Sequence, residues 1–230
     1  MRVLSIRSIA AVVVLLATTA CASTGSADPG TAPERSSGTP GPDLERLEAI
    51  ARARADSARM TVHEADVEFM QGMIHHHAQA LVMSLLAPDA GASPSVLTLT
   101  RRILNAQRDE IALMQRWLRE RDRMVPEVTE NGEMPGMEGS MMHMHMPGML
   151  SPAQLDELSK AQGSEYDRLF LTYMIQHHEG AVTMVHDLFA IDGAAQDDAI
   201  FKIASDIQVD QRTEIARMQR MLDALGGAAP

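Results

Sequence analysis

The chain has 230 residues and a formal net charge of −11, with 31 acidic and 20 basic side chains. The chain is acidic and has no run of basic residues that could form a positively charged surface, which argues against nucleic-acid binding. The single Cys excludes a disulfide framework and a thiolate metal site, so a metal would be held by His, Met, Asp or Glu. Methionine is unusually common at 18 residues while aromatics make up 3%, and the long segments rich in Ala, Leu, Arg and Glu predict an all-α fold.

The N-terminal segment, residues 1–21, has the pattern of an export signal. Arg2 and Arg7 precede an apolar run over 9–17 that is too short to span a bilayer, and small residues lead into Cys21. The sequence TTAC at 18–21 resembles a lipobox, with Thr where Leu is favoured, and predicts lipidation of Cys21. A simple cleavage after Ala20-Cys21-Ala22 is the alternative. We therefore expect export to the periplasm or cell surface, with membrane contact only through a lipid anchor.

Composition divides the rest of the chain into five regions. Residues 22–42 are rich in Ser, Thr, Gly and Pro and predict a flexible linker, and 43–60 predict a leading helix. A first helical hairpin is expected over 61–124 and a second over 151–226. Between them, residues 125–150 form a loop rich in Met and His, where Gly and Pro argue against a continuous helix.

Three helix starts are indicated by capping residues. Thr61 and Glu64 form a candidate capping box, and Ser93 is a candidate N-cap followed by Pro94. Ser151 is a candidate N-cap for a short helix. We expect the long helices to cover about 61–86, 95–124, 164–191 and 195–225.

An internal repeat is the strongest organisational feature. Residues 69–77, FMQGMIHHH, align without a gap with 170–178, FLTYMIQHH. After a three-residue shift, the pattern Gln-x-x-Glu-Ile-x-x-Met at 107–114 recurs at 211–218. Each half is thus a His-bearing helix followed by a Gln/Glu/Met helix, and two such amphipathic pairs predict a four-helix bundle with a pseudo-twofold axis.

The helical period sorts the histidines by face. At 100° per residue, His76 and His77 share the apolar face with Met73 and Met83, whereas His75 falls on the opposite side and is expected at the surface. The second half repeats the inward set with Met174, His177, His178 and Met184. Met at helical spacing ordinarily only fills a core. Four buried imidazoles, however, each need a partner, and either metal coordination or a His–Glu network would supply it.

Carboxylates on the same faces suit the role of orienting the histidines. Glu110 and Glu214 are expected to point inward, where they could accept a His N–H and fix its tautomer, or ligate a harder metal directly. Asp66 and Asp167 share the inward face of the His helices and are assigned to the same supporting role.

The donor types favour a soft metal. Di-iron bundles need Glu-x-x-His, but Met73 and Ile74 stand three residues before His76 and His77. Thioether with imidazole suits Cu(I), and Ag(I) by the same logic. The loop adds six consecutive donors: Met141, Met142, His143, Met144, His145 and Met146. A disordered linker, acting as an oxidant sink through Met sulfoxide, is the alternative for that segment.

These motifs resemble the domain of unknown function 305 family over about residues 61–225. The resemblance rests on the paired Asp-x-x-Phe-x-x-x-Met-Ile-x-His-His motifs from Asp66 and Asp167, and on Met-Pro-Gly-Met at 146–149. It implies a ferritin-like four-helix bundle exported from the cytoplasm, and CopM-like members are linked to copper binding and resistance. The metal-binding positions it implies are Met73, His76, His77, Met83, Met174, His177, His178 and Met184. Ala78-Gln79 departs from Glu179-Gly180 in the second half, so the two sites are expected to differ.

The leading prediction is a non-catalytic, exported protein that binds Cu(I) or silver and buffers copper, confers resistance or delivers the metal to another copper-handling protein. No nucleophile–base arrangement is present. Two alternatives stay open. One is a metal-dependent oxidoreductase with His and Glu ligands inside the bundle, and the other is a metal-free structural or interaction module.

Overall fold

The structure is a computed structural model that describes residues 42–60, 62–135 and 146–226. The predicted export signal and the linker up to residue 41 lie outside this part of the chain, and so does Cys21. Five predicted loop ligands also lie outside the described residues: Met141, Met142, His143, Met144 and His145.

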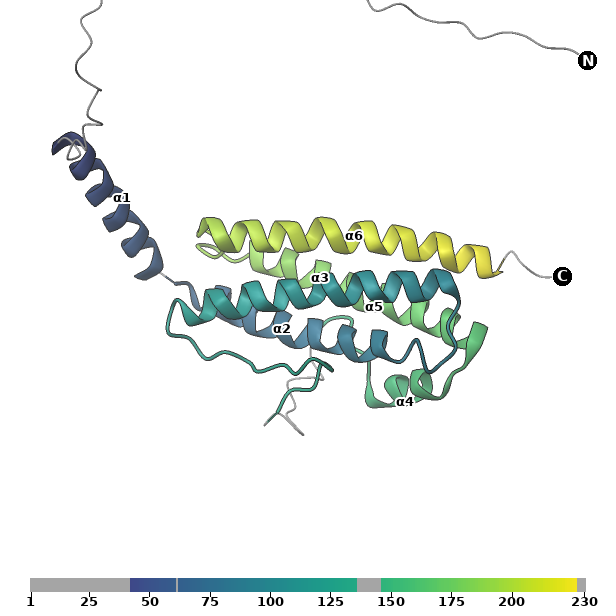
Figure 1. Cartoon of the computed structure of the whole chain (residues 1–230). Helices are drawn as coiled ribbons and strands as arrows, with labels where there is room; N and C mark the ends of the chain where they lie inside the picture. Colours follow the sequence, from purple (N-terminus) through teal and green to yellow (C-terminus); the bar gives the residue numbers. More distant parts are fainter. Residues whose placement is uncertain (1–41, 61, 136–145, 227–230) are drawn as a thin grey trace, which may run out of the picture.

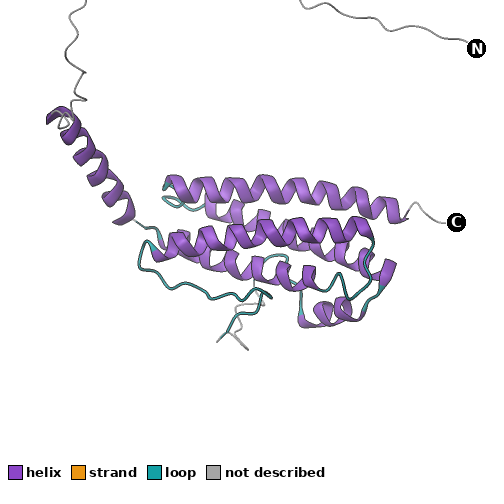
Figure 2. Ribbon diagram, viewed as in Figure 1, coloured by secondary structure: helices purple, strands orange, loops and turns teal. Residues whose placement is uncertain are grey.

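All regular elements of the described residues are helices, as Figure 2 shows. They are α1 (Pro42–Met60), α2 (Glu64–Leu85), α3 (Pro94–Arg119), α4 (Pro152–Lys160), α5 (Gly163–Phe189) and α6 (Asp198–Gly226). The four long helices α2, α3, α5 and α6 pack side by side, α4 lies at one end of the bundle, and α1 stands apart from it (Figure 1). The hairpins α2–α3 and α5–α6 meet mainly along α2 and α5. The prediction of an all-α four-helix bundle built from two hairpins is confirmed.

Local capping explains where the helices begin. The Ser93 and Ser151 hydroxyls cap α3 and α4 as predicted, and Ser151 forms a capping box with Gln154. The predicted Thr61 cap is wrong. The N-cap of α2 is His63, whose Nδ1 accepts the main-chain N–H of Ala65, so the helix begins at Glu64.

Two long helices are shorter than expected because specific residues redirect the chain. After α3 ends at Arg119, Asp122 adopts a φ of 51°, a left-handed conformation that stops the helix five residues before the predicted end at 124. Ala195, with a φ of 54°, stands in the turn before α6. The Asp197 carboxylate accepts the N–H groups of Ala199 and Ile200 and so sets the start of α6 at Asp198.

The bundle core consists of two apolar clusters separated by a polar layer. One cluster joins the first half of α2 and α6 with the second half of α3 and α5, and the other cluster joins the remaining halves. Between the clusters lie buried polar side chains of all four helices: His76, His77, Gln107, His177, His178 and Gln211. This arrangement follows from the repeat, since each His helix carries its histidines near the middle and crosses the other antiparallel to it.

Asp66 and Asp167 connect each hairpin to the loop of the other hairpin. Asp66 Oδ1 accepts the N–H of Ala195 at 2.7 Å, and both Asp167 oxygens accept the N–H of Ser93, at 3.2 and 3.3 Å. Each Asp lies about 15 Å along its helix from the first inward His, at 1.5 Å per residue. The prediction that these carboxylates orient the histidines is therefore wrong, because the helical wheel gives an angle but no axial position.

The described parts of the segment between α3 and α4, residues 120–135 and 146–151, lie along the outer face of α2 (Figure 1). Gln71 donates to Met124 O at 2.9 Å, and Gln79 exchanges two hydrogen bonds with the main chain of Leu150. At Gly132 the backbone lies so close to α2 that an added Cβ would be 2.5 Å from Ala78 O. His75 lies on this covered face and is 1% exposed, so the prediction that it is a surface residue is wrong.

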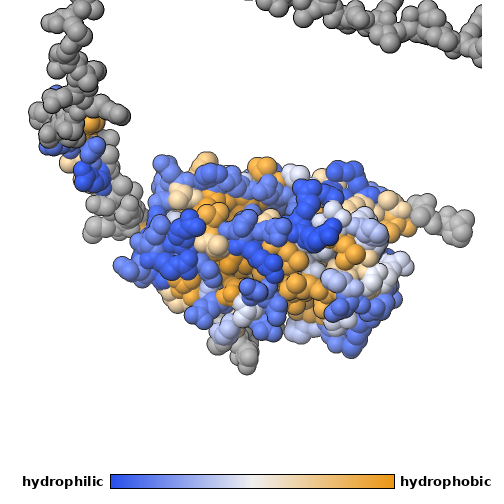
Figure 3. Space-filling view, viewed as in Figure 1, coloured by the Kyte–Doolittle hydropathy of each residue, from blue (hydrophilic) through white to orange (hydrophobic). Residues whose placement is uncertain are grey.

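The visible face of the bundle is largely hydrophilic, with apolar patches among the charged residues (Figure 3). None of the helices in the described residues has the length and apolar character needed to cross a bilayer.

Candidate metal centre

Four imidazoles lie buried where α2 crosses α5. His76, His77 and His178 have no exposed surface, and His177 is 1% exposed. The rings of His76 and His177 face each other across the pseudo-twofold axis, with centroids 3.8 Å apart and planes inclined by 38°. The repeat therefore brings its two histidine pairs into one place in the centre of the bundle.

The two glutamates predicted to point inward each contact one imidazole. His77 Nε2 donates to Glu110 Oε2 at 2.6 Å, and His178 Nε2 donates to Glu214 Oε2 at 2.8 Å. Each pair joins the two helices of one hairpin, so the pairing is the same in both halves. A carboxylate at Nε2 fixes the proton on that nitrogen and leaves the Nδ1 lone pair free to act as a ligand.

The central pair is held differently. His76 Nε2 donates to the carbonyl of Pro147 at 3.1 Å, which also places its proton on Nε2. Within the described residues, neither ring nitrogen of His177 has a hydrogen-bond partner of good geometry, although the ring approaches the main chain of His76. Burial, followed by the charge of His77, lowers the pKa of His76 to about 3. Burial, followed by the charges of His76 and its neighbours, lowers the pKa of His177 well below the ordinary range. Both central rings are thus neutral at physiological pH.

Buried nitrogen atoms without partners mark this layer as a place for a ligand. In the described part of the chain, Nδ1 of His76, His77, His177 and His178 is buried and makes no hydrogen bond. A buried polar atom without a partner costs about 1–3 kcal/mol. Neutral imidazole nitrogens with open lone pairs are the donors that Cu(I), Ag(I) and other borderline to soft metals accept.

Two methionine side chains lie beside Gly72, one helical turn before His76. If Gly72 of α2 carried a Cβ, that atom would lie 3.6 Å from Met146 Sδ and 3.4 Å from Met184 Cε. Met146 precedes Pro147, whose carbonyl binds His76. The Met146 sulfur and the Met184 methyl group therefore meet at Gly72, which lies one helical turn before His76 on α2.

Gly180 holds the segment that carries Met146 against α5. A Cβ at Gly180 would lie 2.0 Å from Pro147 O and 2.7 Å from Gly148 Cα, so only glycine permits this contact. Gln176 also donates to Gly148 O at 3.3 Å. The backbone at 146–148 is thus fixed between α2 and α5, directly over the histidine layer.

The other predicted methionine ligands lie within the apolar clusters. Met73 belongs to one cluster, Met83 and Met174 belong to the other, and all three are fully buried. Met184 also packs against the first of these clusters. The ligand role of Met73, Met83 and Met174 stays a prediction. The structure thus brings together His76, His77, His177 and His178, with Glu110 and Glu214 behind two of the rings. Met146 and Met184 meet at Gly72, one helical turn from His76.

Within the described ranges, no three His, Cys, Asp or Glu side chains are arranged to hold a metal ion by themselves. The sequence interpretation missed the roles of Gly72, Gly180 and the Pro147 carbonyl. The exchange of Gly72 for Tyr173 and of Gly180 for Gln79 between the repeats was the available signal for two of them, because a glycine in one copy only indicates a local close approach.

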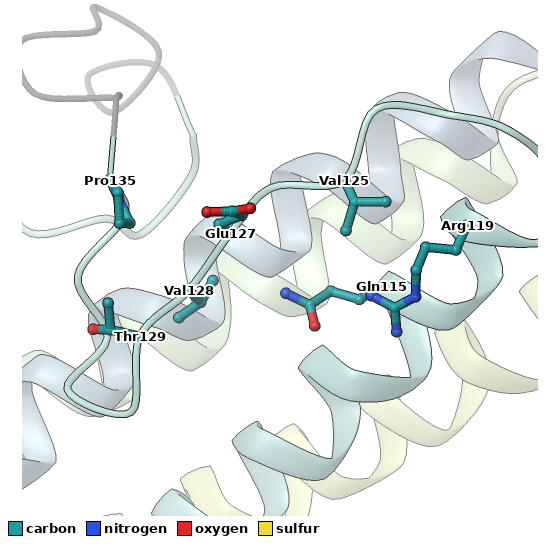
Figure 4. Close-up of a pocket in the computed structure, with 7 residues that line it drawn as sticks. All are labelled: Gln115, Arg119, Val125, Glu127, Val128, Thr129 and Pro135. Carbon is teal, nitrogen blue, oxygen red and sulfur yellow. The ribbon is translucent and has the colours of Figure 1, made fainter.

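A surface pocket of about 440 Å³ lies elsewhere, between α3 and the segment that follows it (Figure 4). Gln115 and Arg119 of α3 lie opposite Glu127, Val128 and Thr129 in it. None of the predicted metal ligands lines this pocket, and it stays apart from the histidine layer.

The fold and this centre define a class: a duplicated antiparallel helical bundle with a buried layer of histidines and adjacent methionines. The chain belongs to the DUF305 family, the domain of unknown function 305, whose family model matches residues 66–222. A comparison with curated proteins gives no match.

Solved structures of the same family share this fold. A DUF305 protein from Streptomyces coelicolor, described as secreted, is 26% identical with a TM-score of 0.59, covering 70% of this chain and 94% of its own. A DUF305 fragment from Deinococcus radiodurans is 29% identical with a TM-score of 0.59, covering 71% and 98%. CopM in its Cu(II)-bound form is 29% identical with a TM-score of 0.53, covering 69% and 96%. CopM has also been solved in Cu(I)-bound and Ag-bound forms.

Proposed function

We propose that this protein binds Cu(I), and Ag(I) by the same chemistry, in the histidine layer of its bundle. The observation that carries the proposal is the set of buried imidazoles whose Nδ1 atoms make no hydrogen bond in the described residues, with Met146 and Met184 at Gly72 one helical turn away. Imidazole and thioether form a soft to borderline donor set. The copper- and silver-bound structures of CopM, a member of the same fold family, support the choice of metal.

The biological role that follows is copper buffering, resistance or delivery outside the cytoplasm. The signal pattern at 1–21 supports export, and Cys21 would anchor the protein to a membrane by a lipid. The run of donors at 141–146 would capture the metal or pass it to a partner protein. Catalytic turnover is no part of this proposal.

An anaerobic Cu(I) titration of the chain from residue 22 onward, against a competing chelator, tests the proposal. We expect tight binding that is lost when His76 and His177 are both replaced by Gln. His186 is a matched control, because it is exposed and contacts only Gln208 and Arg212 in the described residues. Micromolar or weaker binding that the His76/His177 double variant leaves unchanged would contradict the proposal.

The short contacts between imidazole and carboxylate favour one other candidate, a metal-dependent oxidoreductase with His and Glu ligands. Metal analysis of protein from native cells separates the two. Stoichiometric iron or manganese would favour the oxidoreductase, whereas copper would favour the proposed copper-binding protein.

A further inference from the structure

The leading helix α1 exposes apolar side chains and does not pack along the bundle. It spans Pro42–Met60 and stands apart from the other helices (Figure 1). Leu44, Leu47 and Ile50 are 51%, 62% and 40% exposed. A helix of 19 residues is only marginally stable by itself in water, because most helical stability in proteins comes from the packing of an apolar face. The described part of the chain supplies no such packing for α1.

The apolar residues of α1 form a stripe that is bulky at one end and narrow at the other. At 100° per residue, five positions share an arc of about 80°: Leu44, Leu47, Ala51, Ala55 and Ala58. Two leucines thus come first and three alanines follow. If two copies of this helix pair in antiparallel orientation, the leucines of each copy lie opposite the alanines of the other, and the contact fills evenly. A parallel pair would set leucine on leucine and leave a gap between the alanines.

The charges of α1 separate along its length in the same way. Residues 43–48 include three acidic residues and one basic residue, whereas residues 52–59 include three basic residues and one acidic residue. Glu48 and Arg52, both exposed, mark the border between the two halves. In an antiparallel pair the acidic half of one copy lies beside the basic half of the other, but in a parallel pair like charges meet. Because the two signs balance, α1 also lacks the basic face with which a helix binds an anionic membrane surface.

The short connection to the bundle favours the same orientation. Only residues 61–63 separate α1 from α2. With 19 residues, α1 is about 28 Å long at 1.5 Å per residue. An antiparallel pair therefore places the two bundles at opposite ends of the paired helices, whereas a parallel pair would bring both bundles to the same end, where they compete for space.

We propose that α1 is a self-association helix through which two copies of this chain form an antiparallel dimer. Leu44 and Leu47 of each copy pack on the alanines at 58 and 55 of the other, around a twofold axis near Ala51. The pairing needs no metal, so it stands apart from the proposed function. Because two helices of this length bury a small interface, we expect a dissociation constant in the micromolar range.

Sedimentation velocity of the metal-free chain from residue 22 onward, at rising concentration, tests the proposal. We expect a shift from monomer to dimer. Leu47→Lys places a charge in the stripe at almost no cost in helix propensity and should weaken dimerisation at least about 10-fold. Ala49→Lys is the matched control, because it adds the same charge on the opposite, exposed face of α1 and should leave dimerisation unchanged.

A chain that stays monomeric at every concentration, or a dimer that Leu47→Lys leaves intact, would overturn the proposal. Slow hydrogen exchange of the α1 amides in such a monomer would show that the helix docks on its own bundle instead.

Disulfide trapping tests the orientation. The sequence has one Cys, Cys21, so the chain from residue 22 onward has no thiol of its own. Under mild oxidation, Ala51→Cys should form an intermolecular disulfide, because the twofold axis brings the two thiols together. Ala58→Cys should not, since position 58 lies opposite Leu44 of the other copy. Equal trapping of the two variants would overturn the antiparallel arrangement.

Discussion

The two hairpins of this bundle share one set of polar contacts and differ in another. Both contain a His–Glu pair between their helices, at 2.6 Å in the first hairpin and 2.8 Å in the second. They differ where the 146–150 segment meets them. The first hairpin binds it through the side chains of His76 and Gln79. The second binds it through the side chain of Gln176 and also admits its backbone against Gly180. The common contacts join the two helices within each hairpin, and the different contacts hold one segment between two hairpins that are otherwise alike.

The largest effect is expected at Gly180. Gly180→Ala would place a Cβ 2.0 Å from the Pro147 carbonyl, in a backbone contact that has no room to adjust. We expect a loss of about 2–4 kcal/mol in the free energy of unfolding, even after the gain in helix propensity. Urea unfolding measures it.

Gly72→Ala is the matched control for Gly180→Ala. Its Cβ would meet side chains at 3.4 and 3.6 Å, which is ordinary contact, so the helix propensity of Ala should stabilise the protein by up to about 1 kcal/mol. Equal destabilisation by both substitutions would show that the contact at Gly180 is not special.

Acid should destabilise the bundle through its central imidazoles. His76 and His177 have lowered pKa values in the fold, so below about pH 6.5 the unfolded chain binds protons that the folded chain does not. Stability is therefore complete above pH 6.5 and falls as the pH drops toward 3. Each ring contributes about 1.4 kcal/mol per pH unit in that window, or about 2 kcal/mol between pH 6.5 and 5.

Unfolding free energies at several pH values, measured without metal, check this slope. His177→Gln removes one titrating ring and should reduce the slope of the unfolding free energy against pH by the contribution of one proton. An unchanged slope would mean that His177 is protonated in the folded state, against the effect of its burial.

A smaller effect should distinguish the two loop-binding aspartates. Asp66→Ala removes one short bond of 2.7 Å to Ala195, and Asp167→Ala removes two longer bonds of 3.2 and 3.3 Å to Ser93. We expect about 1.5 kcal/mol for Asp66 and about 1 kcal/mol for Asp167, since the main-chain N–H is left without its acceptor. Thermal unfolding of the two variants side by side is the measurement. A clear reversal of the order would show that the loops, rather than these bonds, set the cost.

The helical period of the sequence predicted the bundle and the inward direction of the paired histidines. The pattern of apolar residues occurs in both repeats, and each apolar stripe must be buried against another helix. The angular position of a residue around its helix could not predict how far Asp66 lies along the helix from the histidines. It also could not predict that the segment after α3 covers His75. The first depends on where the opposite loop ends, and the second on the path of a segment without a regular period. The position of Met146 was likewise beyond prediction, since it depends on close backbone contacts at Gly72 and Gly180.

The reciprocal bonds from Asp66 to Ala195 and from Asp167 to Ser93 bear on how such a protein arose. Each hairpin supplies the carboxylate that satisfies the loop of the other, as two identical subunits do across an isologous interface. A symmetric homodimer of one hairpin could form both contacts. In one chain the two copies need not be identical, and Gly72 and Tyr173 differ at equivalent positions. The present molecule thus has the contact pattern of a symmetric dimer whose two copies are joined in one chain.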